Sequence, residues 1–95
     1  MAHELRIPQK VLNDSEAREL LRVWISGDAQ TFALRPDAWS DPAAWGLLLV
    51  DLARQVAQGY AQKLGVDAEA VLARIKEGFD AEWAVPTDVP PGDQG

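Results

Sequence analysis

The sequence predicts an α+β fold in the order β-α-β-α-α, with a small sheet and one long, buried central helix. Two short segments alternate apolar and polar residues, as half-buried strands do. Three longer segments repeat apolar residues at helical spacing and follow residues that favour a helix start. Hydrophobic residues make up 47% of the 95 residues, which is ordinary for a folded chain. We therefore expect a single domain over residues 1–85.

The first half of the chain is expected to hold the sheet and one helix. Residues 4–7 form the first strand, which Pro8 ends because proline has no N–H to donate. A helix should follow, starting within residues 13–15, where three good capping residues stand together. Gly27 would end it. Its apolar stripe recurs at i, i+3, i+4 and i+7, in Ala17, Leu20, Leu21 and Trp24.

A second strand is expected over residues 30–35, before the turn residues Pro36 and Asp37. The central helix then begins at Asp41 and Pro42, runs to about Leu64, and is closed by Gly65.

The third helix is expected to start at Asp67, which caps it. Its apolar stripe comprises Ala68, Val71, Leu72, Ile75, Phe79 and Trp83. Residues 86–95 contain three prolines and little to bury, and we expect a disordered tail there.

The central helix is unusually apolar around its circumference. At about 100° per residue, its polar side chains gather in one narrow wedge, comprising Asp51, Gln55, Gln58 and Gln62. The remaining apolar arc is more than twice the roughly 100° that an ordinary surface helix needs. Either another helix of the chain covers the excess, or a second copy does. The expected homodimer seam comprises Leu47, Val50, Arg54, Ala57 and Ala61.

The expected sheet also favours association between copies. Two short strands are marginally stable alone, and their free edges can pair with other strands. Joining two such sheets across a two-fold axis would give four strands. One dimer would then both cover the apolar arc of the central helix and pair the free strand edges.

Charge and composition argue against several classes of function. The net charge is −6, which disfavours nucleic acids and anionic membranes as partners. Cysteine is absent, as suits a cytoplasmic location, and the longest apolar run is far shorter than the roughly 20 residues of a membrane span. The single histidine, His3, is expected to be an exposed terminal residue. We expect no catalytic residue, no metal and no cofactor.

The segment LRPDAWSDPAAWGLLLVDLARQVAQGYA, residues 34–61, resembles a small bacterial domain family of unknown function. The earlier Ile7-Pro8 and ELLRVWI segments fit the same resemblance, which covers about two-thirds of the chain. The family implies a histidine in the central helix where this chain has Gln55. It implies no activity.

Three functional hypotheses follow. The first is a cytoplasmic, non-catalytic module that forms a homodimer and docks another protein. The second is a small-molecule binder or minor enzyme with a tryptophan-lined pocket, whose ligand-binding residues would be Asp51, Arg54, Tyr60 and Trp83. The third is an acidic partner of a basic protein.

Overall fold

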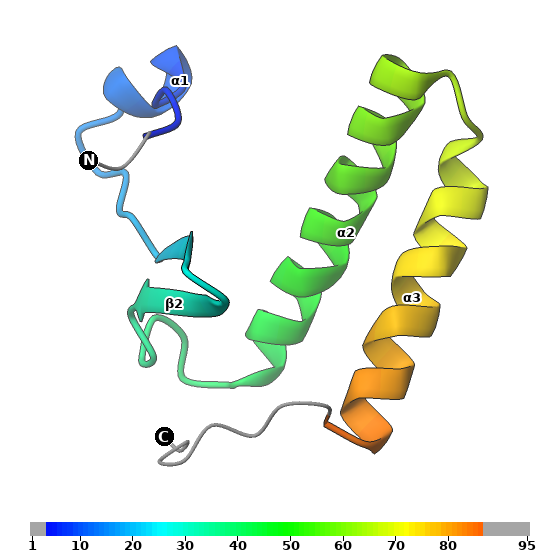
Figure 1. Ribbon diagram of the computed structural model, residues 1–95. Coiled ribbons are helices and arrows are strands. Elements are labelled where there is room, and N and C mark those ends of the chain that lie inside the picture. Colours follow the sequence, from blue (N-terminus) through cyan, green and yellow to red (C-terminus); the bar gives the residue numbers. More distant parts are fainter. Residues whose placement is uncertain (1–3, 87–95) are drawn as a thin grey trace. The chain divides into compact units, whose positions relative to one another are not determined.

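The computed structural model describes residues 4–86 and divides the chain into two compact units, residues 1–40 and 41–95. The elements are α1 (Gln9–Leu12), β1 (Leu21–Ser26), β2 (Ala29–Leu34), α2 (Ala43–Leu64) and α3 (Ala68–Ala84) (Figure 1). The predicted α+β class is confirmed, but the order is α-β-β-α-α. The single domain expected over residues 1–85 stays a prediction. The expected tail lies outside the described residues, except for Pro86.

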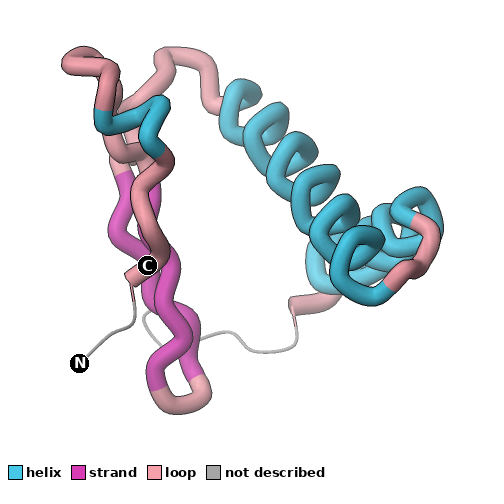
Figure 2. The backbone as a smooth tube through the Cα atoms, turned by 90° about the horizontal axis from the view of Figure 1, so that it is seen from above, coloured by secondary structure: helices cyan, strands magenta, loops and turns pink. Residues whose placement is uncertain are grey.

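The first unit is built around a β-hairpin, whose two strands lie side by side in Figure 2. β1 and β2 pair antiparallel, with Leu21 opposite Leu34 and Ser26 opposite Ala29. The loop is two residues long, and Gly27 takes a φ of 63° there. A positive φ at the first loop residue alone is the pattern of a type II′ turn, which suits the twist of a hairpin. The strand expected over residues 30–35 is therefore confirmed as β2.

The prediction of a helix between residue 13 and Gly27 is wrong, because β1 occupies the second half of this segment. The capping residues instead form a local turn, in which the Asp14 side chain accepts a hydrogen bond from the Glu16 N–H at 2.9 Å. Asp commonly stabilises turns in this way. Further along, Val23 and Ile25 are β-branched and flank Trp24, a composition that favours a strand. Gly27 marks the hairpin loop rather than the end of a helix.

The strand expected over residues 4–7 is also wrong. The sheet of the described chain consists of β1 and β2, and Leu5 is 93% exposed. Alternation of apolar residues is not enough to make a strand when no partner supplies the ladder hydrogen bonds. The chain instead makes one helical turn, α1, directly after Pro8.

One face of the hairpin is apolar. Side chains alternate between the two faces of a strand, so residues opposite one another in the register share a face. Five large apolar side chains lie on one side, contributed by Leu21, Val23, Ile25, Phe32 and Leu34. All except Leu21 are exposed.

The second unit is a helical hairpin in which α2 and α3 run side by side in opposite directions (Figure 1). The predicted start and end signals are present. The Asp41 side chain accepts from the Ala43 N–H at 3.0 Å, and the Asp67 side chain accepts from the Ala70 N–H at 3.2 Å. Gly65 closes α2 with a φ of 70°, a left-handed conformation that glycine adopts without a Cβ clash.

Small residues let the two helices approach. Ala53, Ala57 and Ala61 recur every four residues on α2, and Ala57, at 2% exposure, is the one buried hydrophobic residue of the described chain. From α3, Val71, Leu72 and Ile75 are half-buried. Packing is therefore closest in the part of the hairpin near the connecting loop. The central helix is long as expected, but most of its large side chains are exposed.

Two of the three glycines in α2 and at its C-cap, Gly59 and Gly65, give a matched test. Gly65→Ala should lower the free energy of unfolding by about 1 kcal/mol, because alanine is strained at positive φ. Gly59→Ala should raise it by about 0.5–1 kcal/mol, since Gly59 lies inside a helix and a Cβ there meets no atom within 4 Å. Urea denaturation followed by circular dichroism measures both. Shifts in the same direction would contradict the assignment of Gly65 as the helix cap.

Candidate functional site

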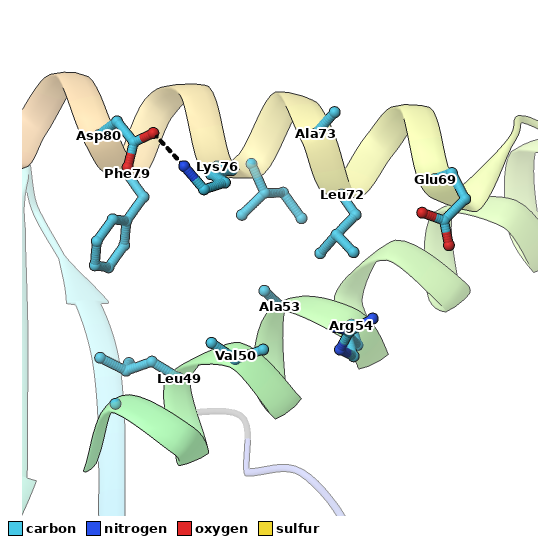
Figure 3. A pocket seen from close by; sticks show the side chains of 12 residues that line it. Leu49, Val50, Ala53, Arg54, Glu69, Leu72, Ala73, Lys76, Phe79 and Asp80 are labelled. Atoms are coloured by element: carbon cyan, nitrogen blue, oxygen red, sulfur yellow. Dashed lines mark hydrogen bonds and ion pairs between the residues drawn. The ribbon is translucent and has the colours of Figure 1, made fainter. Parts of the chain in front are cut away.

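The candidate site is an apolar groove of about 500 Å³ on the helical hairpin, between α2 and α3 (Figure 3). Helix α2 lines it with Gly46, Leu49, Val50, Ala53 and Arg54. Helix α3 lines it with Glu69, Leu72, Ala73, Ile75, Lys76, Phe79 and Asp80. In the close view, Leu72 and Phe79 extend from α3 toward α2. The groove is thus framed by two helices and lined chiefly by hydrocarbon.

The groove exists because small residues stand where large ones would be needed to fill the space between the helices. Gly46, Ala53 and Ala73 contribute little volume. Leu49 and Phe79 are each about half exposed, so the interdigitation found in protein cores is missing here. The groove is a surface able to receive side chains from outside.

Helix α3 covers only the middle of the apolar arc of α2. At about 100° per residue, Ala53, Ala57 and Ala61 lie near the centre of the face toward α3. On one flank, Leu47 is 70% exposed and Val50 is 50% exposed. On the other flank, Leu52 and Val56 are exposed. One neighbouring helix is therefore too narrow a cover for this arc.

The rim of the groove carries charges of both signs. Lys76 Nζ lies 2.7 Å from Asp80 Oδ2, and Glu69 and Arg54 are exposed at the other end of the groove. Exposed ion pairs of this kind contribute little to stability. Their effect is to give the rim a mixed pattern rather than a field of one sign.

The structure distributes the expected seam residues over two environments. Ala57 is buried inside the helical unit and Ala61 is half-buried. Leu47, Val50 and Arg54 are exposed, and the last two line the groove. The seam itself stays a prediction.

The residues expected to bind a small molecule are not gathered in the groove. Of the four, only Arg54 lines it, and no tryptophan does. Arg54 and Asp51 make no ion pair with each other in the described chain. Trp83 is 80% exposed and stacks on Phe79, with ring centroids 5.7 Å apart.

Among the groove residues that the sequence analysis did not assign to any site, four have large apolar side chains, namely Leu49, Leu72, Ile75 and Phe79. The signal was available, because three of them belong to the predicted stripe of the third helix. The sequence does not fix how α2 is rotated about its axis relative to α3, and this rotation decides which side chains line the groove.

A second cluster of polar contacts lies at the base of the β-hairpin. Arg22 donates a hydrogen bond to the Glu19 carboxylate and lies 3.9 Å from the Glu4 carboxylate. Arg35 Nε donates to the Glu19 carbonyl oxygen at 2.8 Å. The hydrogen bond from Arg22 lowers the pKa of Glu19, and the positive charges of Arg22 and Arg35 act in the same direction. The same contact raises the pKa of Arg22.

Two further features are absent from the described residues. No three acidic or histidine side chains within residues 4–86 lie together so that they could hold a metal ion. Over the same residues, no helix has the length and apolar character that crossing a membrane requires.

Comparison with known proteins gives a family and a solved relative. The family described as a domain of unknown function (DUF5076) matches residues 4–87. A structure from the photosynthetic bacterium Rhodopseudomonas palustrus CGA009 is 34% identical, with a TM-score of 0.75 over 100% of this chain and 97% of its own. That protein is provisionally described as a pyruvate dehydrogenase. No curated protein matches the chain.

The Glu19 carboxyl should titrate below its ordinary pKa of 4.5, as carbon-detected NMR can measure. Because the folded pKa is lowered, the contact stabilises the hairpin above pH 4.5 and is lost as the pH falls through the folded value. Arg22→Gln should raise the Glu19 pKa toward 4.5. Arg18→Gln, which removes the same charge nearby, should move it less. An unchanged Glu19 pKa in Arg22→Gln would contradict the assigned cause.

Proposed function

The chain belongs to the DUF5076 family, and we propose that it is a non-catalytic cytoplasmic module that acts by self-association as a homodimer. The observation that carries this proposal is the exposure of α2. Its apolar arc is covered by α3 only in the middle, and large side chains on both flanks remain in contact with water. Extended apolar surface on a folded protein is typical of an interface.

A second copy is a suitable cover for the groove. Two helical hairpins facing each other across a two-fold axis would place four helices around one core, a common arrangement for amphipathic helices. Val50, Leu49 and Phe79 of each copy would enter the groove of the other. Fully burying a side chain of this kind contributes about 1.5–3 kcal/mol. A two-fold interface uses the same patch on both partners, so each apolar side chain counts twice.

The charges of both signs at the rim of the groove also support a second copy of the chain as the partner. Each chain carries a net charge of −6, so two copies repel one another at long range. Near the groove, however, Arg54 and Lys76 stand beside Glu69 and Asp80. A two-fold axis can therefore set opposite charges against each other at the rim, which keeps the local repulsion small.

We do not extend the dehydrogenase description of the Rhodopseudomonas protein to this chain. Oxidative decarboxylation of a 2-oxo acid depends on a cofactor that stabilises a carbanion. The groove is lined mainly by hydrocarbon, and its polar groups stand at the rim. A groove of this composition is better suited to the apolar side chains of a protein partner than to a small acid that carries both a carboxylate and a keto group.

Sedimentation equilibrium tests the proposal directly. Over micromolar concentrations, the protein should sediment with twice the 10.4 kDa mass of the chain. Dilution should shift it toward the monomer. A monomer at every concentration up to that of an NMR sample would overturn the proposed function.

A charge placed in the groove should weaken the dimer. Val50→Glu would bury a carboxylate against apolar side chains, and we expect the dissociation constant to rise at least about tenfold. Gln58→Glu is the matched control, because it adds the same charge to the polar wedge of the same helix. Equal dissociation constants for the two variants, measured by sedimentation, would place the interface elsewhere on the chain.

A further inference from the structure

We infer that two copies of this chain also join through the outer edges of their β2 strands, in an antiparallel two-fold pairing centred on Phe32. The result is a four-stranded sheet. This inference rests on the proposed homodimer and names a particular surface within it.

The register of the hairpin fixes which backbone groups point outward from β2. Ser26 and Ala29 flank the two-residue loop and form a hydrogen-bonded pair, and such pairs alternate with non-hydrogen-bonded ones along an antiparallel ladder. The Arg35 N–H donates to the Leu20 carbonyl at 3.0 Å, in phase with this alternation. The N–H and C=O groups of Gln30, Phe32 and Leu34 therefore face away from β1. They form a row of donors and acceptors that a further strand could satisfy.

β2 is the unguarded edge of the hairpin. Proteins commonly protect free edges with a charged residue or a proline, and the β2 sequence AQTFAL contains neither. β1 differs, because Arg22 lies within it and contacts both Glu19 and Glu4. The two edges are thus chemically distinct, and the uncharged one is where we place the second copy.

Pairing centred on Phe32 satisfies every outward group. Phe32 would lie opposite Phe32 of the second copy, and Gln30 opposite Leu34 at both ends. All three outward residues would then form hydrogen-bonded pairs. A shift to an axis through Thr31 would leave Leu34 opposite the loop instead. The same register keeps Phe32 and Leu34 on one side of the sheet, so the apolar face of each hairpin continues across the seam.

Charge does not oppose this register. In antiparallel pairing centred on Phe32, residue 35 lies opposite residue 29, so Arg35 lies opposite Ala29 of the second copy and not opposite another arginine. The two-fold axis repeats this arrangement at the other end. Like charges directly opposite one another would destabilise a pairing.

Disulfide crosslinking tests the register, in a chain that has no cysteine of its own. In the proposed pairing, residue 31 lies opposite residue 33 of the second copy in a non-hydrogen-bonded pair, with Cα atoms about 4.5 Å apart. Thr31→Cys/Ala33→Cys should therefore form a covalent dimer on mild oxidation. Within one strand, Cβ atoms two residues apart are about 6.8 Å from each other, too far for an internal disulfide.

The single variants are the matched controls. Residue 31 of one copy would lie about 8 Å from residue 31 of the other, beyond disulfide reach, and the same holds for residue 33. We expect the double variant to crosslink at least about tenfold faster than either single variant. Crosslinking of Thr31→Cys alone at the same rate as the double variant would overturn the register centred on Phe32.

Hydrogen exchange on the unmodified protein gives a second measurement that needs no variant. The amides of Phe32 and Leu34 should gain protection as protein concentration rises, whereas those of Val23 and Ile25, on the outer edge of β1, should not. If the protein sediments as a dimer but shows neither the added protection nor the crosslinking, the β2 pairing is overturned and the proposed function stands. A protein that sediments as a monomer would overturn both.

Discussion

The apolar arc on α2 is wider than one neighbouring helix can cover, and this width decides how the helical unit packs. A helix that packs on one neighbour needs an apolar stripe of roughly 100°, and this helix carries more than twice that. Its alanines face α3 and allow close approach, while its leucines and valines lie on either side of the contact. Because the largest side chains flank the packed face, the helical hairpin alone buries little of its own hydrocarbon.

The β-hairpin also leaves apolar side chains uncovered. Its one apolar face carries Val23, Ile25 and Phe32, all exposed, and its two strands supply no further layer. Short chains bury a smaller fraction of their surface than long ones and often need oligomerisation to become stable. Over residues 4–86, each unit has an apolar surface and neither has an enclosed core. This distribution of hydrocarbon supports the proposed self-association independently of which interface forms.

Secondary structure could be predicted from the sequence where a segment fits only one periodicity. The prediction failed where a segment fits both the helical and the strand periodicity. α2 and α3 were predictable because Asp41, Gly65 and Asp67 mark their ends and long stripes fill their interiors. Residues 17–26 satisfy a helical spacing through Leu20 and Trp24, yet Leu21, Val23 and Ile25 also alternate as in a strand. The β-branched residues and the two-residue Gly27 loop decided the outcome. The groove could not be predicted, because it depends on the rotation of α2 against α3, which no local pattern fixes.

The asymmetry between the two strand edges explains how such a sheet could stop growing. A free edge that pairs with any other edge leads to open, fibre-like association, whereas a two-fold contact between identical edges closes on itself. If β2 meets β2, the outer edges of the four-stranded sheet are both β1 strands. These carry Arg22, held by Glu19 and Glu4. The charge that makes β1 a poor partner would therefore limit the assembly to two copies, so one arginine would separate a defined dimer from indefinite strand addition.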